Sequence, residues 1–132
     1  MLNAADRAFA ERLSQAGINT RDATPAYLEE LRGRYTGISH VVALPNSTED
    51  VAKTVRLCAE ARVGIVPFGG GTGLVGGQVA REGPPPLILS LEKLARLRAV
   101  YPNENTLVAE AGMTLTQVQT CADKAGRLFP LS

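Results

Sequence analysis

Residues 67–77 read Pro-Phe-Gly-Gly-Gly-Thr-Gly-Leu-Val-Gly-Gly, and six of the 13 glycines in the chain lie between positions 69 and 77. Glycine has no Cβ and adopts positive φ angles freely, so consecutive backbone N–H groups in such a run can turn inward. A nest of this kind binds phosphate oxygens without a cationic side chain. The run holds no Lys or Arg, so we expect backbone dipoles and the Thr72 hydroxyl to hold a phosphate group.

Two common phosphate-binding motifs fail on the context of this run. Residues 71–76 match G-x-G-x-x-G, with Glu92 at about the distance of a ribose-binding acid. That motif needs a helix to begin inside it, whereas residues 77–83 lead into three prolines. The P-loop needs Lys and Ser/Thr where Gly77 and Gln78 stand. A flexible loop without a ligand is the remaining alternative, and the prolines on both flanks count against it.

The residues before the glycine run predict a βαβ unit. An apolar stretch at residues 41–44 predicts a buried strand, and residues 63–68 predict the next one. Between them, residues 47–50 read as a helix start, and the helix is expected to bury Val51, Val55 and Cys58 and to stop at Gly64. Strand, helix and strand in so short a span favour a parallel arrangement.

The rest of the chain adds further elements to this α+β pattern. Upstream, residues 3–16 predict an amphipathic helix capped by Asn3. Downstream, residues 87–91 predict a strand, and residues 97–101 and 106–111 predict an antiparallel hairpin across a Pro-Asn-Glu-Asn turn. A capping box at residues 114–117 then begins a helix that ends at Gly126.

Composition is that of an ordinary globular domain, with 132 residues, 45% apolar residues and a net charge of +1. There is no basic excess to suggest nucleic-acid binding and no apolar run long enough for a membrane span. The first residues do not resemble a secretion signal, so we expect a cytoplasmic protein. Cys58 and Cys121 are expected to be buried reduced thiols, and the single histidine, His40, has no evident catalytic partner.

Four stretches together resemble the vanillyl-alcohol oxidase/p-cresol methylhydroxylase family of FAD-linked oxidoreductases. They are PNSTEDV at 45–51, IVPFGGGTGLVGG at 65–77, EAG at 110–112 and LFPL at 128–131. The similarity extends from about Tyr27 onward and is greatest to the 2-hydroxyacid branch, with D-lactate dehydrogenase, D-2-hydroxyglutarate dehydrogenase and the glycolate oxidase flavin subunit.

The resemblance implies a fold, a cofactor and a set of binding residues. The fold is α+β, the first subdomain of a PCMH-type FAD-binding domain, with a small mixed sheet. The glycine run would wrap the FAD pyrophosphate, and it holds no His, Cys or Tyr, so the FAD would be non-covalent. The implied cofactor-binding residues are Pro67, Gly69, Gly70, Gly71, Thr72, Gly73, Leu74, Gly76 and Gly77, together with Pro130 and Leu131.

The resemblance also implies a larger enzyme. Residues 1–38 would form an N-terminal helical segment, and residues 39–132 the N-terminal half of a truncated FAD-binding domain, whose missing C-terminal half would be its partner. The whole enzyme would oxidise a small 2-hydroxy acid. Arg32 and Arg34 are the candidate contacts to the substrate carboxylate, because an arginine fork binds carboxylate in a bidentate manner; a solvated surface loop is the alternative.

Two other functions stay open. The chain could be a non-catalytic, truncated nucleotide-binding module. It could also belong to another branch of the same family, such as an ether-lipid synthase or a cell-wall precursor reductase.

Overall fold

The computed structural model describes residues 1–131. The chain divides into two compact units, Met1–Lys93 and a second that begins at Leu94. Each unit combines helices with strands, so the predicted α+β class is confirmed. None of the helices in the described part of the chain has the length and apolar character needed to span a membrane.

The first unit is built on a four-stranded mixed sheet in the order β1-β2-β4-β3. Strands β2 (Val41–Ala43), β4 (Leu87–Ser90) and β3 (Ile65–Phe68) run parallel, and β1 (Thr20–Asp22) joins β2 antiparallel. The central β4 is buried along its whole length, which is typical of a parallel strand covered on both faces. The sequence analysis did not predict β1, whose residues Thr-Arg-Asp carry no apolar signal.

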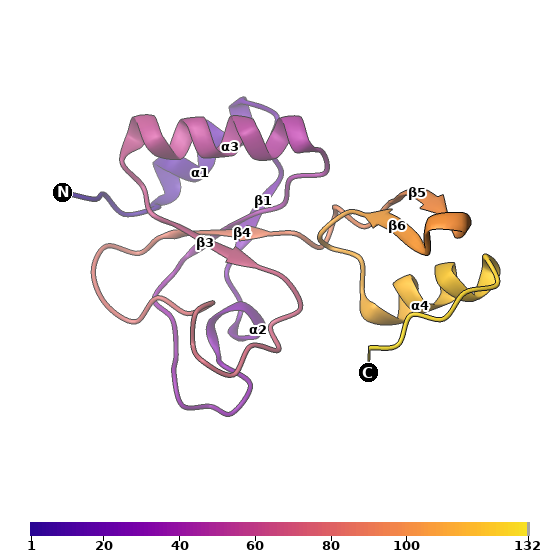
Figure 1. Ribbon diagram of the computed structural model, residues 1–132. Coiled ribbons are helices and arrows are strands. Elements are labelled where there is room, and N and C mark those ends of the chain that lie inside the picture. The colour runs from indigo at the N-terminus through magenta and orange to yellow at the C-terminus, as the bar shows by residue number, and fades with distance from the viewer. Residues whose placement is uncertain (132) are drawn as a thin grey trace. The chain divides into compact units, whose positions relative to one another are not determined.

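Helices α1 (Arg7–Gln15) and α3 (Thr48–Ala61) lie on one side of this sheet, and the short α2 (Pro25–Leu28) lies on the other (Figure 1). Side chains in β4 alternate between two cores, as strand geometry requires. Leu87 and Leu89 pack in the core that includes residues of α1 and α3, whereas Ile88 packs with Tyr27 and Phe68.

Three predicted details of the helices were wrong. Helix α1 begins after Asp6, whose carboxylate accepts from Phe9 N, and Asn3 instead donates to the carbonyl of Ala61. Helix α3 begins at the predicted Ser47 cap, but it ends at Arg62 in the left-handed region rather than at Gly64. Val55 is 44% exposed; the buried face of α3 follows Thr54 and Cys58, because the Thr54 hydroxyl is satisfied by the carbonyl of Asp50.

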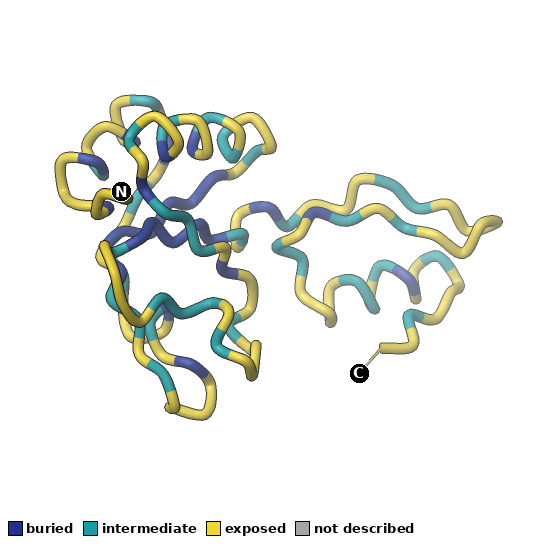
Figure 2. Tube along the Cα trace, turned by 60° about the vertical axis from the view of Figure 1, so that its left-hand side comes forward, coloured by how far each residue is buried: buried dark blue, intermediate teal, exposed yellow. Residues whose placement is uncertain are grey.

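The second unit holds the predicted hairpin and the predicted capped helix. Strands β5 (Leu97–Tyr101) and β6 (Thr106–Ala109) pair antiparallel across the 3₁₀ turn η1 (Pro102–Glu104). Helix α4 (Leu115–Lys124) carries the full capping box between Thr114 and Gln117. Little of this unit is buried (Figure 2): among its described residues only Leu94, Glu110 and Ala122 are, and Cys121, expected to be buried, is half-buried.

Candidate functional site

The parallel strands β3 and β4 bring two connecting segments to one edge of the sheet. The glycine loop, residues 69–77, leaves the carboxyl end of β3, and Glu92 follows the carboxyl end of β4. Ligands of open parallel sheets bind at this edge. The structure therefore places the glycine loop where the sequence analysis expected it, after a strand whose last residue, Phe68, is buried.

Two positions of the glycine loop strongly favour glycine over any residue with a side chain. Gly71 has φ +71°, and a Cβ there would lie 2.9 Å from Phe68 Cζ. Gly76 has φ +73°, and its Cβ would lie 3.0 Å from Tyr35 Cδ2. Both the backbone angle and the space disfavour side chains, so the loop backbone lies directly on the two aromatic rings.

The backbone donors of the glycine loop are largely unused. Within residues 1–131, the N–H groups of Gly69, Gly70, Thr72 and Leu74 donate to no acceptor, and the Thr72 hydroxyl has no partner. A Cβ at Gly69 would meet nothing within 4 Å, so this part of the backbone is open to a ligand. Free N–H groups on an exposed, glycine-rich backbone fit a phosphate or pyrophosphate group.

Gln78 braces the glycine loop, and the sequence analysis missed this role. Its Nε2 donates to Gly71 O at 2.8 Å, and its Oε1 accepts from Gly73 N at 3.3 Å. The side-chain amide of Gln78 thus forms two hydrogen bonds to the backbone of the loop, one at Gly71 and one at Gly73. The available signal was an amide side chain directly after the glycine run, which the sequence analysis used only to exclude a P-loop.

The backbone of the segment that contains Arg32 and Arg34 is hydrogen-bonded to a buried carboxylate, that of Glu30. Glu30 is 2% exposed, and its Oε2 accepts from the backbone N–H groups of Arg32 and Arg34 at 3.1 and 3.2 Å. Glu30 Oε1 has no partner in the described residues. The side chains of Arg32 and Arg34 are exposed and form no ion pair within residues 1–131, so their guanidinium groups are available to an anion.

The same segment also contacts the second half of the glycine loop. Tyr35 packs on Gly76, and the Arg81 guanidinium stacks over the Tyr35 ring at 4.5 Å from its centroid. Ile38 N donates to Ala80 O at 3.0 Å. The nearest downstream cation of the loop, Arg81, is thereby held beside it.

A cluster of polar side chains follows β4. Glu92 accepts from Arg21 Nη2 and from the Tyr27 hydroxyl, each at 2.8 Å, and from the Ser90 hydroxyl at 3.2 Å. Partial burial raises the pKa of Glu92, but the hydrogen bond from Tyr27 and the charge of Arg21 outweigh it, so this pKa is lowered. Burial, together with the bond to Glu92, raises the pKa of Tyr27.

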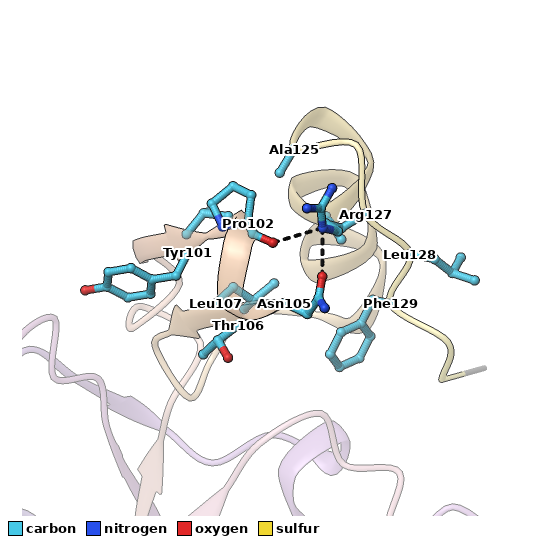
Figure 3. Close-up of a pocket in the computed structure, with 11 residues that line it drawn as sticks. Tyr101, Pro102, Asn105, Thr106, Leu107, Ala125, Arg127, Leu128 and Phe129 are labelled. Carbon is cyan, nitrogen blue, oxygen red and sulfur yellow. Dashed lines mark hydrogen bonds between the residues drawn. The ribbon is translucent and has the colours of Figure 1, made fainter.

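The second unit contains a separate cavity of about 470 Å³ between its hairpin and α4 (Figure 3). Arg127 Nε donates to Pro102 O at 3.0 Å and to Asn105 Oδ1 at 2.7 Å beside it. The lining is mostly apolar and offers no catalytic group: Val100, Tyr101, Pro102, Asn105, Thr106, Leu107, Ala122, Ala125, Arg127, Leu128 and Phe129. Pro130 and Leu131 follow this lining; both are exposed, and Leu131 O accepts from Gln119 Nε2 at 2.7 Å.

Curated proteins are similar in sequence to about three quarters of this chain. D-2-hydroxyglutarate dehydrogenase of Xanthomonas citri pv. viticola is 40% identical over 98 residues, which cover 74% of this chain and 20% of that protein. The mitochondrial cytochrome-type D-lactate dehydrogenase of Arabidopsis thaliana is 33% identical over 94 residues, covering 71% of this chain and 16% of that protein. The chain therefore spans about one fifth of the length of these curated relatives.

Solved structures share the fold at low sequence identity. Alkyldihydroxyacetonephosphate synthase superposes with a TM-score of 0.78 at 19% identity, covering 94% of this chain and 26% of that one. A variant of berberine bridge enzyme in complex with (S)-reticuline gives 0.73 at 17% identity, covering 92% and 27%. The FAD binding domain family matches residues 39–132. With its glycine loop at the carboxyl end of a parallel strand in a mixed sheet and this match over most of its length, the chain belongs to the FAD binding domain family.

Proposed function

We propose that the glycine loop holds the pyrophosphate of a non-covalent FAD through its backbone N–H groups. The observation that carries the proposal is that the N–H groups of Gly69, Gly70, Thr72 and Leu74 have no acceptor in the described part of the chain, at the carboxyl end of β3, where ligands of such sheets bind. Pro67, Gly71, Gly73, Gly76 and Gly77 set the course of this backbone. Pro130 and Leu131 are proposed as further contacts to the cofactor.

The proposed whole protein is an oxidoreductase that oxidises a 2-hydroxy acid of the D-2-hydroxyglutarate, D-lactate or glycolate type. FAD, when bound, accepts a hydride, and the protein supplies binding and orientation. The names of the relatives support this substrate class. In this proposal the glycine loop binds and orients the cofactor, and the remaining length of such an enzyme supplies the catalytic acid and base.

Arg32 and Arg34 are proposed as contacts to the substrate carboxylate. Their guanidinium groups are exposed and form no ion pair with the residues that the structure describes, which supports this role. A cytoplasmic location is likewise a proposal for this chain, and one of the relatives described above is named as mitochondrial.

Two rival functions are a non-catalytic nucleotide-binding module and another branch of the family, such as an ether-lipid synthase. The longest protein that carries this chain should be purified, and its FAD content and its reduction of a dye with D-2-hydroxyglutarate, D-lactate and glycolate should be measured. FAD with dye reduction supports the proposed oxidoreductase. FAD without turnover of any hydroxy acid favours a rival, and a protein that binds no FAD contradicts the role of the loop.

A further inference from the structure

Three elements of the first unit converge on one carboxylate that follows the end of β4. Arg21 comes from β1, Tyr27 from α2, and Ser90 is the last residue of β4 itself. Glu92 uses both oxygens: Oε1 accepts from Arg21, and Oε2 accepts from Tyr27 and Ser90. The carboxylate is only half-exposed, so its charge-assisted hydrogen bonds fix the Tyr27 hydroxyl more firmly than neutral partners would.

The Tyr27 ring, held in place by Glu92, packs against the ring of Phe68. The two rings lie with their centroids 5.0 Å apart and tilted by 60°, both in the core on the α2 side of the sheet. A tilted pair at this distance is a favourable aromatic arrangement. The backbone of Phe68 is held separately, because Leu91 N donates to Phe68 O at 2.9 Å.

Phe68 in turn lies directly against the glycine loop. Phe68 Cζ is 2.9 Å from the place that a Cβ on Gly71 would take, so the ring lies against the Gly71 backbone. The loop residues around Gly71 are exposed and donate few hydrogen bonds within residues 1–131. A loop with so little bonding of its own depends on what lies beneath it for its shape.

We propose that Tyr27 and Glu92 are positioning residues for the glycine loop, acting through the Phe68 ring. Glu92 fixes Tyr27, Tyr27 fixes Phe68, and Phe68 sets the course of the backbone at Gly71. The consequence for FAD rests on the proposed function: a loop held in one conformation binds the pyrophosphate without the cost of ordering it first.

Two variants of the 132-residue chain separate this role from general stability. Tyr27→Phe removes one hydroxyl and keeps the ring, and Glu92→Gln keeps the shape and removes the charge. Glu60→Gln is the matched control, because Glu60 pairs with Arg12 on the helices and does not touch the loop. NMR relaxation of the backbone amides at 69–77 reports loop order without any ligand, and quenching of flavin fluorescence reports FAD affinity.

The proposal expects both test variants to lower the order parameters of the loop amides from about 0.85 towards 0.6. FAD affinity should fall by about threefold to tenfold, while Glu60→Gln changes neither quantity. Unchanged loop order in a folded Tyr27→Phe protein would overturn the proposal, even if its melting temperature falls. Failure of the longest protein that carries this chain to bind FAD would contradict the proposed function, and the order parameters would still decide whether Tyr27 and Glu92 set the loop.

Discussion

The side chain of Gln78 donates to the carbonyl of Gly71 at 2.8 Å across the mouth of the glycine loop. Gln78→Glu removes that donor and places a negative charge beside the proposed pyrophosphate. We expect FAD affinity to fall by about tenfold or more, since a lost hydrogen bond and a repulsive charge act together. Gln15→Glu makes the same chemical change at the end of α1, away from the loop. Equal FAD dissociation constants in the two variants would show that Gln78 has no role in FAD binding.

Gly71→Val should abolish FAD retention and leave the helix content measured by circular dichroism nearly unchanged. The new side chain would need a left-handed backbone and would meet the Phe68 ring. Gly17→Val is the control, because Gly17 also has positive φ, at +84°, but its Cβ would meet nothing within 4 Å. This control should lower the free energy of unfolding by about 1–2 kcal/mol and retain FAD. Flavin that co-purifies with Gly71→Val would show that the loop is not the cradle.

Acid denaturation of the FAD-loaded protein should release all of its flavin into the supernatant. A covalent link needs a nucleophilic side chain, and residues 69–77 contain no His, Cys or Tyr. The absorbance near the flavin band in pellet and supernatant after acid precipitation measures the outcome. Colour that remains in a washed pellet would contradict non-covalent binding.

Stability of the second unit should fall in acid because of Glu110. Hydrogen bonds from the Arg96 side chain and backbone lower the pKa of Glu110 to about 2, below the value of about 4.3 expected in an unfolded chain. The ionised form therefore stabilises the fold fully above pH of about 4.3, and this contribution is lost as the pH falls towards 2.

Urea unfolding followed by NMR signals of β5 and β6 measures this dependence. Glu110→Gln should be less stable at neutral pH and should lose less stability between pH of about 5 and 2. Glu104→Gln is the control, because Glu104 is exposed and its side chain forms no ion pair in the described residues. The same acid response in both variants would exclude Glu110 as the cause.

The two thiols should react at very different rates. Burial raises the pKa of Cys58 to about 11, and its side chain is 1% exposed, whereas Cys121 is half-buried. Because the thiolate is the reactive form, alkylation of Cys58 at pH of about 8 should be at least about 100-fold slower. Peptide mass spectrometry after timed iodoacetamide treatment measures both sites. Cys121→Ser should then leave a protein that alkylates only on unfolding; prompt labelling of Cys58 would contradict its burial.

Much of the architecture follows from local sequence patterns. The continuous apolar run of β4, the Ser47 cap and the capping box at Thr114 are read within a few residues, and each formed as predicted. Strand β1 was missed because its three residues are polar and the strand forms by pairing with β2, which is distant in the sequence. The face of α3 was misjudged at Val55, because Thr54 gains burial by bonding its hydroxyl to its own helix.

Part of the candidate site could also be predicted from local sequence, and part could not. The glycine run is evident from the sequence alone, since six glycines within nine residues favour a backbone nest that binds phosphate. The contacts that brace it are not evident, because Tyr27 and Glu92 are 65 positions apart. Glu30 was also missed, because charged residues in an irregular segment ordinarily indicate solvent exposure. Its side chain instead accepts hydrogen bonds from the backbone N–H groups of Arg32 and Arg34.

The order β1-β2-β4-β3 has a consequence for how the chain acquires its structure during synthesis. Strands β2 and β3 are both made before β4, yet they do not pair with each other, and β4 lies between them. A nascent chain that has not yet reached Leu87 would display two unpaired apolar edges, which are the surfaces that recruit chaperones or seed aggregates. The core of this domain therefore closes only after the glycine loop and the three prolines have left the ribosome.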